Sequence, residues 1–147
     1  MSPARTVSAG LVVDASVAMK WLVDEDGSEA AFALRDRDLA APALLRIEVA
    51  NVLRTLVARK AATSGEALDL FTLFQDAPVT IVDQDEALER RALQLGLDFG
   101  HPVYDCVYLA LAERMGRVLV TADNRFLKAL RSTVHAAQVV ALEAVTS

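Results

Sequence analysis

Four acidic residues occupy positions at which an α/β fold would bring carboxylates together. Asp14 directly follows the apolar run 10–13, and Asp123 follows the apolar run 118–121 by two residues. In an open parallel sheet, the carboxyl ends of the strands form the crevice in which ligands bind. Both acids are therefore predicted to face the same edge of the sheet.

The other two acids, Asp105 and Glu48, lie on predicted helices. Segment 103–112 is apolar nearly all round, so its helix should be buried on several sides with Asp105 at its open end. Glu48 borders an apolar stripe that contains Leu45 and Val49 but no Lys or Arg. A half-buried glutamate without a partner is unfavourable.

Four converging carboxylates would repel one another strongly unless a cation lay among them. Oxygen ligands of this kind suit a hard divalent cation such as Mg²⁺ or Mn²⁺. Such a cation can activate water and stabilise the charge that develops on a phosphoryl group. The predicted chemistry is phosphodiester hydrolysis.

Each of these residues also has a purely structural explanation. Asp14, Ser16 or Asp123 could be an ordinary helix N-cap. Asp105 could interact favourably with the dipole of its helix, and Glu48 could reach water from the border of its stripe. The functional interpretation depends on the four acids occurring together.

Composition limits the possible classes of protein. The 147 residues, 54% of them hydrophobic, predict a single domain over 1–147, with residues 1–9 flexible. Charges interrupt every apolar run before membrane-spanning length, and the N-terminus lacks a signal-peptide pattern, so we expect a cytoplasmic protein with no membrane partner. One cysteine excludes internal disulfides, and the two histidines cannot form a zinc site alone. The net charge of −5 argues against a generic basic nucleic-acid-binding surface, although an acidic centre can meet phosphate through a cation.

Short apolar runs alternate with segments of helical period, which predicts a three-layer α/β/α sandwich around a central, mostly parallel sheet of about five strands. The predicted strands are residues 10–13, 39–41, 79–82, 118–121 and 139–142. The predicted helices are residues 16–23, 28–36, 42–60, 64–76, 84–95, 102–115 and 124–130.

Boundary residues refine these helices. Prolines suit the first helical position, and glycines commonly follow the last one. We expect helix starts at Pro42 and Pro102, capping boxes at Asp83 with Glu86 and at Thr63 with Glu66, and helix ends at Gly96 and Gly116.

Other conspicuous residues have a structural interpretation at this stage. His101 is expected in a turn, and Cys106 as a small packed side chain. Trp21, Phe71 and Phe74 are expected in the core or against a partner. Four basic residues near the acidic motifs could contact phosphate or lie on a solvated surface, and these are Lys20, Arg46, Arg54 and Arg125.

Four segments resemble, in order and spacing, the motifs of PIN-domain ribonucleases, and more narrowly those of the VapC toxins of bacterial toxin–antitoxin pairs. The segments are VVDASVAMKWLVDE (12–25), PALLRIEVANVL (42–53), YDCVYLALA (104–112) and LVTADNRF (119–126). Together the resemblance extends from residue 11 to about residue 142, and it implies a PIN-like fold.

The resemblance implies roles for particular residues. It implies that Asp14, Glu48, Asp105 and Asp123 bind Mg²⁺ or Mn²⁺ and activate water for RNA cleavage. Ser16 and Thr121 would support them by hydrogen bonding around the acids. Some members carry a further acid where this chain has Arg125, and this difference favours a single bound ion.

The resemblance also implies partners, and two other functions stay open. The chain would form a homodimer, cleave RNA, and be inhibited by a VapB-like antitoxin whose C-terminal segment covers the active-site groove. One alternative is a Mg²⁺-dependent phosphatase with Asp14 as nucleophile, although such an enzyme would be expected to carry Asp where Ser16 stands. The other is a non-catalytic PIN-type module that binds RNA or a protein.

Overall fold

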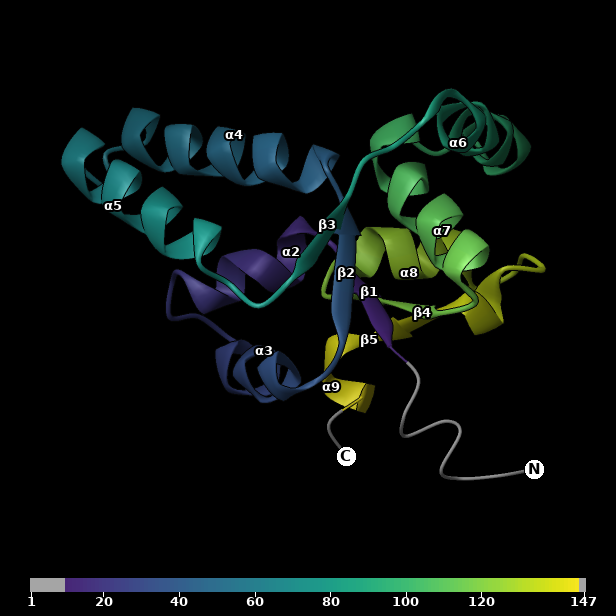
Figure 1. Ribbon diagram of the computed structural model, residues 1–147, viewed down its shortest axis with the longest axis horizontal. Helices are drawn as coiled ribbons and strands as arrows, with labels where there is room; N and C mark the ends of the chain where they lie inside the picture. The colour runs from purple at the N-terminus through teal and green to yellow at the C-terminus, as the bar shows by residue number, and fades with distance from the viewer. Residues whose placement is uncertain (1–9, 146–147) are drawn as a thin grey trace.

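A computed structural model describes residues 10–145 of the chain (Figure 1). The predicted flexibility of residues 1–9 lies outside the described residues. One five-stranded sheet has the strand order β3-β2-β1-β4-β5, with all pairings parallel. Its strands are β1 (Leu11–Val13), β2 (Leu39–Pro42), β3 (Thr80–Val82), β4 (Val118–Thr121) and β5 (Val139–Ala141). The prediction of a central parallel sheet of about five strands is confirmed.

Helices cover both faces of the sheet, which confirms the α/β/α class. In Figure 1, α6 and α7 lie on one side of the sheet, α2 and α3 lie on the other, and α4 and α5 form a pair that projects to one side. The helices are α2 (Ala15–Ala18), α3 (Ser28–Ala33), α4 (Leu44–Ala58), α5 (Ser64–Gln75), α6 (Glu86–Phe99), α7 (Val103–Met115), α8 (Asn124–Leu130) and α9 (Leu142–Val145). Three short 3₁₀ segments are η1 (Met19–Trp21), η2 (Leu34–Asp36) and η3 (Ala136–Gln138).

The apolar strand sequences reflect burial on both faces. Every residue of β1 and β2 is buried, as are the last three residues of β4. In the central register, Val12 is paired with Ala40 on one side and Leu119 on the other. Parallel strands covered by helices on both faces have continuous apolar runs rather than alternating ones, which explains why these segments could be recognised.

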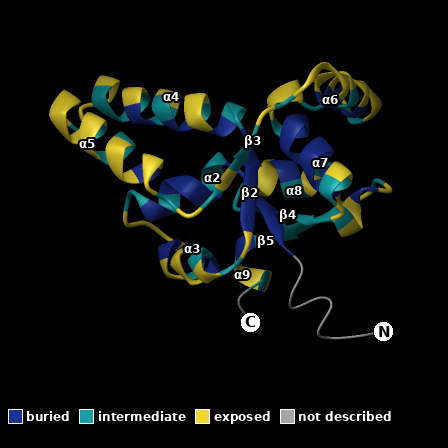
Figure 2. Ribbon diagram, in the orientation of Figure 1, coloured by how far each residue is buried: buried dark blue, intermediate teal, exposed yellow. Residues whose placement is uncertain are grey.

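Helix α7 is the most deeply buried helix segment near the acids. Residues Cys106 to Ala112 are all buried, as Figure 2 shows by the dark colour along α7, while the outer faces of α5 and α6 are exposed. This confirms the burial predicted from its nearly continuous apolar sequence. Cys106 is a small packed side chain, as expected, and burial raises the pKa of its thiol to about 11.

Both prolines expected to start helices lie just outside them. Pro42 is the last residue of β2, paired with Val82, and α4 begins two residues later. Pro102 is the residue before α7, and its ψ of 138° is extended. The fixed φ of proline fits an extended residue as well as a helical one, so proline alone could not distinguish these positions.

The predicted bounds of α6 were wrong at both ends. Asp85, not Asp83, caps the helix, because its side chain accepts a hydrogen bond from the Leu88 N–H at 2.8 Å. Gly96 lies inside the helix, which ends at Gly100 with φ of 62°. A glycine at position 96 has a packing role, since an added Cβ would lie 3.0 Å from the carbonyl oxygen of His101.

Several other boundary predictions hold. Thr63 and Glu66 form the expected capping box, and Gly116 ends α7 with φ of 66°. The last turns of the predicted helices 16–23 and 28–36 are the 3₁₀ segments η1 and η2. Helix α9, which begins at Leu142 directly after β5, was not predicted.

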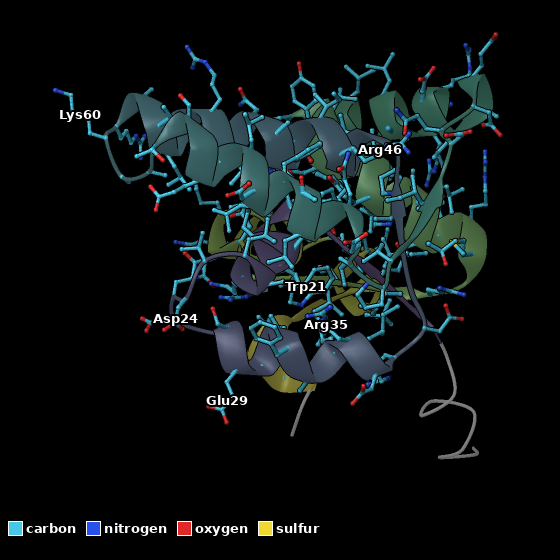
Figure 3. The ribbon with its side chains drawn as sticks, turned by 60° about the vertical axis from the view of Figure 1, so that its left-hand side comes forward. Trp21, Asp24, Glu29, Arg35, Arg46 and Lys60 are labelled. Atoms are coloured by element: carbon cyan, nitrogen blue, oxygen red, sulfur yellow. The ribbon has the colours of Figure 1, made fainter. Side chains whose placement is uncertain are left out.

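Trp21 lies in the core, which is one of the two positions expected for it. It is 5% exposed, and its indole N–H donates to the Ala31 carbonyl at 2.8 Å, which anchors η1 to α3. Figure 3 shows Trp21 in the interior beside α3, whereas Lys60 projects outward where α4 gives way to α5. Between residues 10 and 145, the helices are all too short or too polar to cross a membrane.

Candidate active site

Asp14 lies at the end of β1, where the chain turns into α2. Its side chain is the N-cap of α2 and accepts hydrogen bonds from the N–H groups of Ser16 at 3.1 Å and Val17 at 3.3 Å. The capping interpretation is therefore correct, but capping does not require burial, and Asp14 is only 6% exposed. A capping aspartate normally gains its stability at the surface, so burial here needs another explanation.

Two hydroxyl groups complete the surroundings of Asp14. Ser16 Oγ donates to Asp14 Oδ1 and Thr121 Oγ1 donates to Asp14 Oδ2, each at 2.5 Å. Ser16 Oγ also accepts from the Ala122 N–H at 2.8 Å, and Thr121 Oγ1 accepts from the Asp123 N–H at 3.0 Å. These bonds join the end of β1 to the end of β4, and both carboxylate oxygens of Asp14 are held in place.

Burial dominates the electrostatics of Asp14. It raises the pKa of this carboxyl from 3.8 to about 6, against the lowering effect of the bonds from Ser16, Thr121 and Val17. The negative charge of Asp105 raises the pKa further. Because a raised carboxyl pKa marks a charge that the surroundings disfavour, Asp14 would gain from a nearby cation.

Glu48 has a partner that the sequence did not reveal. The hydroxyl of Tyr108, on α7, donates a hydrogen bond to Glu48 Oε1, on α4. Burial raises the pKa of Glu48, the Tyr108 bond opposes this effect, and the charge of Asp105 adds to it. The prediction of a half-buried glutamate without Lys or Arg is correct, but its partner is an uncharged phenol.

Asp105 lies in the first turn of α7 and contacts His101. The distance from His101 Nε2 to Asp105 Oδ2 is 2.7 Å, and the two side chains are 13% and 30% exposed. The ring of His101 also packs against that of Phe126, on α8, with 4.8 Å between the ring centroids. His101 is therefore more than a turn residue, because it connects Asp105 to the helix that follows Asp123.

Asp123 is the N-cap of α8. Its Oδ1 accepts hydrogen bonds from the N–H groups of Arg125 at 2.9 Å and Phe126 at 3.3 Å. The backbone of Asp123 is tied to Asp14 through Thr121. For Asp123 too the capping interpretation is correct, and the cap holds its side chain at the same edge of β4 that carries Thr121.

The structure therefore joins the acids in two ways. Asp105 lies near enough to Asp14 and Glu48 for its negative charge to raise the pKa of each carboxyl. Hydrogen bonds through Thr121 connect Asp14 to Asp123. Asp14 follows β1, Glu48 lies on α4, Asp105 lies on α7 and Asp123 follows β4, as the sequence predicted. The two hydroxyl residues, Ser16 and Thr121, lie in direct contact with Asp14.

The donor chemistry of these residues fits a hard divalent cation, because all four acids offer carboxylate oxygens. The raised pKa values of Asp14 and Glu48 also favour a cation between them. As the side chains of residues 10–145 lie, no three carboxylate, imidazole or thiol groups are arranged to hold one ion. Each acid instead has a protein donor, with which a cation would compete for oxygens.

Two hollows in the surface adjoin the acids. One, of about 420 Å³, is lined by Glu48 together with Leu44, Ile47 and Asn51. The other, of about 380 Å³, is lined by Ser16 and Lys20 among others. Both reach Ala15 and Val52, so a chain-like ligand could run past the acids from one hollow to the other.

Of the four basic candidates, Lys20 and Arg125 lie beside the site. Lys20 lines the hollow that contains Ser16, although its Nζ also contacts Glu25 Oε1 at 3.2 Å. Arg125 is exposed and lies two residues after Asp123. Arg46 and Arg54 line other cavities, whose linings within residues 10–145 include none of the four acids.

Tyr108 and His101 are the site residues that sequence reasoning missed or undervalued. Tyr108 lies three residues after Asp105 and therefore on the same side of α7. His101 precedes the extended Pro102 and reaches Asp105 from outside the helix. The helical spacing of Tyr108 from Asp105 was the available signal. The residues around Tyr108 are apolar, so the sequence indicated a core position for this tyrosine and not a site residue.

Comparison with known proteins gives a consistent picture. Residues 11–131 match the PIN domain family. The chain is 34% identical over 116 residues to ribonuclease VapC12 of Mycobacterium tuberculosis, a match that covers 78% of this chain and 88% of that protein.

Solved structures with the same fold include PAE2754 from Pyrobaculum aerophilum and a toxin–antitoxin complex from Klebsiella pneumoniae. The first has a TM-score of 0.69 at 21% identity and covers 95% of this chain and 88% of its own. The second has a TM-score of 0.67 at 13% identity and covers 90% of this chain and 98% of its own. At these identities the two structures support the fold alone.

Proposed function

Because this chain belongs to the PIN-domain family, we propose that it is a metal-dependent endoribonuclease and the toxin of a type II toxin–antitoxin module. The observation that carries the proposal is the buried Asp14. Its oxygens are fixed by Ser16 and Thr121, and its charge is opposed by burial and by Asp105. Burial of a charged carboxylate disfavours folding, whereas carboxylates with pKa values shifted in this way are typical of active sites.

The proposed cofactor is Mg²⁺ or Mn²⁺, held by Asp14, Glu48, Asp105 and Asp123. When bound, this cation would supply the positive charge that activates water and stabilises the phosphoryl group during cleavage. Ser16 and Thr121 would orient Asp14 toward it. The hollows beside Glu48 and Ser16 would hold the RNA strand on either side of the cleaved bond.

We propose a cognate VapB-like antitoxin and a homodimer as the assembly partners. The Klebsiella pneumoniae structure of the same fold is a toxin–antitoxin complex, and we extend this kind of partner to the present chain. An acidic groove would attract a basic side chain of the antitoxin, which would then occupy the place of the cation. Size-exclusion chromatography with light scattering would determine the assembly, and a monomer at all concentrations would contradict the homodimer.

The decisive experiment is cleavage of total bacterial RNA by the purified chain with Mg²⁺, with Mn²⁺ or with EDTA. Discrete fragments should form with metal, and they should be absent with EDTA. Asp14→Asn, which keeps the N-cap oxygen but removes the charge, should abolish cleavage while leaving a folded protein. Asp69→Asn, which changes an exposed acid on α5, is the matched control and should cleave normally.

The alternatives predict different results. A non-catalytic PIN-type module would give no cleavage and would bind no Mn²⁺ in calorimetry. A phosphatase with Asp14 as nucleophile would hydrolyse phosphate monoesters and leave RNA intact. Ser16, which binds Asp14 and Ala122 in place of the second aspartate that such a phosphatase needs, favours the nuclease.

A further inference from the structure

Tyr108 occupies an unusual position for a core tyrosine. It is 1% exposed, lies on the most deeply buried part of α7, and donates its hydroxyl hydrogen to Glu48 Oε1. Glu48 is 60 positions away in the sequence and lies on α4. The bond therefore joins two helices that each contribute one of the candidate acids.

The phenol of Tyr108 lies within the electrostatic reach of three of the four acids. Burial raises its pKa above the usual range, and the charges of Glu48, Asp14 and Asp105 raise it further. A phenol has an ordinary pKa of about 10, so this hydroxyl carries its proton at neutral pH. It acts as a permanent hydrogen-bond donor in the middle of an acidic cluster.

A phenol differs from Lys or Arg in a way that matters for metal binding. A basic side chain would neutralise Glu48 and repel an incoming cation, whereas Tyr108 fixes one carboxylate oxygen and leaves the negative charge in place. Groups that hydrogen-bond to metal ligands orient those ligands and strengthen metal binding. Glu48 lines the adjacent hollow, and the bond from Tyr108 fixes its Oε1 there.

We propose that Tyr108 is a positioning residue that holds the Glu48 carboxylate in the orientation required for divalent-cation binding. This inference rests on the proposed metal-dependent function. It assigns to Tyr108 a role beyond filling the core, because a purely structural tyrosine would affect folding but not the affinity of the folded protein for a cation.

The test is calorimetric titration of the full chain with Mn²⁺ at neutral pH. Tyr108→Phe keeps the buried ring and removes only the donor, and it should weaken Mn²⁺ binding by about 10- to 100-fold. Thr72→Val removes an exposed hydroxyl from α5, outside both hollows, and should leave Mn²⁺ affinity unchanged. Equal affinity in the wild-type chain and Tyr108→Phe would overturn the proposal.

A double-mutant cycle separates positioning from a general packing effect. Glu48→Ala removes the group on which Tyr108 is proposed to act, so adding Tyr108→Phe to it should cause no further loss of Mn²⁺ affinity. A further loss equal to that in the single variant would show that Tyr108 does not act through Glu48. Circular dichroism would verify that each variant is folded.

A measurement on the unsubstituted tyrosine covers the case in which Tyr108→Phe does not fold. Mn²⁺ should perturb the tyrosine ultraviolet spectrum of the wild-type chain and of Tyr104→Phe, in which the remaining tyrosine is Tyr108. Glu48→Gln should abolish that change. A wild-type chain that binds Mn²⁺ without any tyrosine perturbation contradicts the role of Tyr108 alone. A wild-type chain that binds no Mn²⁺ contradicts the proposed function as well.

Discussion

Thr121 Oγ1 donates a hydrogen bond to Asp14 Oδ2 at 2.5 Å, and this bond connects the carboxyl ends of β4 and β1. Both residues are buried, and the register of the two strands places them side by side: Val13 is paired with Val120, one residue before each. The same hydroxyl accepts from the Asp123 N–H. One threonine thus fixes the positions of two of the four acids.

Thr121→Val should destabilise the protein. Valine has nearly the same shape, but it leaves Asp14 Oδ2 and the Asp123 N–H without their partner, and a lost bond to a charged group costs about 1.5–3 kcal/mol. Thr121→Ser keeps the hydroxyl and should restore most of this stability. Urea unfolding in EDTA measures both variants, and equal stability of the valine variant and wild type would contradict this prediction.

Asp14→Asn should stabilise the protein in EDTA at pH 7.5. The folded-state pKa of Asp14 is raised to about 6 from 3.8, so its carboxyl favours folding when protonated, below about pH 4. That contribution is lost as the pH rises through 6. A neutral asparagine avoids the loss, which corresponds to about 3 kcal/mol for a shift of this size.

The pH profile is the signature of this effect. Thermal unfolding of wild type and Asp14→Asn between pH 4 and 8 should give curves whose separation grows from pH 4 to about 6 and then levels off, because both the folded and the unfolded chain have lost this proton at higher pH. Titrating groups that do not interact with Asp14 cancel in the difference. The exposed control Asp69→Asn should show no such growth. A separation that is constant over this range would mean that Asp14 does not titrate as its burial requires.

Divalent cations should reverse the order of stability. Mg²⁺ or Mn²⁺ binds the folded chain through its deprotonated acids, and a concentration 1,000 times the dissociation constant adds about 4.1 kcal/mol, which exceeds the advantage of Asp14→Asn. The melting temperature of the wild-type chain should therefore rise with the cation concentration, while that of Asp14→Asn should rise little. An equal rise in both proteins would place the cation away from Asp14.

Gly96→Ala should destabilise the protein although alanine favours helices by about 1 kcal/mol over glycine. The new Cβ would lie 3.0 Å from the His101 carbonyl oxygen and 3.3 Å from Val103 Cγ2, and overpacking of this kind costs about 1–3 kcal/mol. Gly65→Ala, in open surroundings on α5, is the matched control and should be neutral or slightly stabilising.

Gly96→Ala also tests whether a change in packing at His101 alters cation binding at the acids. His101 bonds to Asp105, so a displaced His101 backbone should disturb that contact. Mn²⁺ affinity in folded Gly96→Ala should fall, while Gly65→Ala should retain the wild-type value. Unchanged Mn²⁺ affinity in Gly96→Ala would show that the His101 contact has no influence on the site.

The sequence by itself determined the fold class and the positions of the four acids along the chain. Buried parallel strands need continuous apolar runs, so β1 and β4 could be recognised, and strand ends follow directly from them. Asp14 and Asp123 were therefore placed correctly at one edge of the sheet. The helix bearing Asp105 was equally clear, because its apolar residues cover nearly the whole surface of the helix.

Only the tertiary structure decided which residues the acids contact. Tyr108 meets Glu48 across 60 positions of sequence, and Thr121 meets Asp14 across 107. Local sequence patterns do not encode contacts of this kind, because they depend on how helices and strands pack. Gly96 shows the same limit. The glycine suggested a helix end, but it lies inside α6, where the close approach of the His101 carbonyl leaves no room for a larger residue.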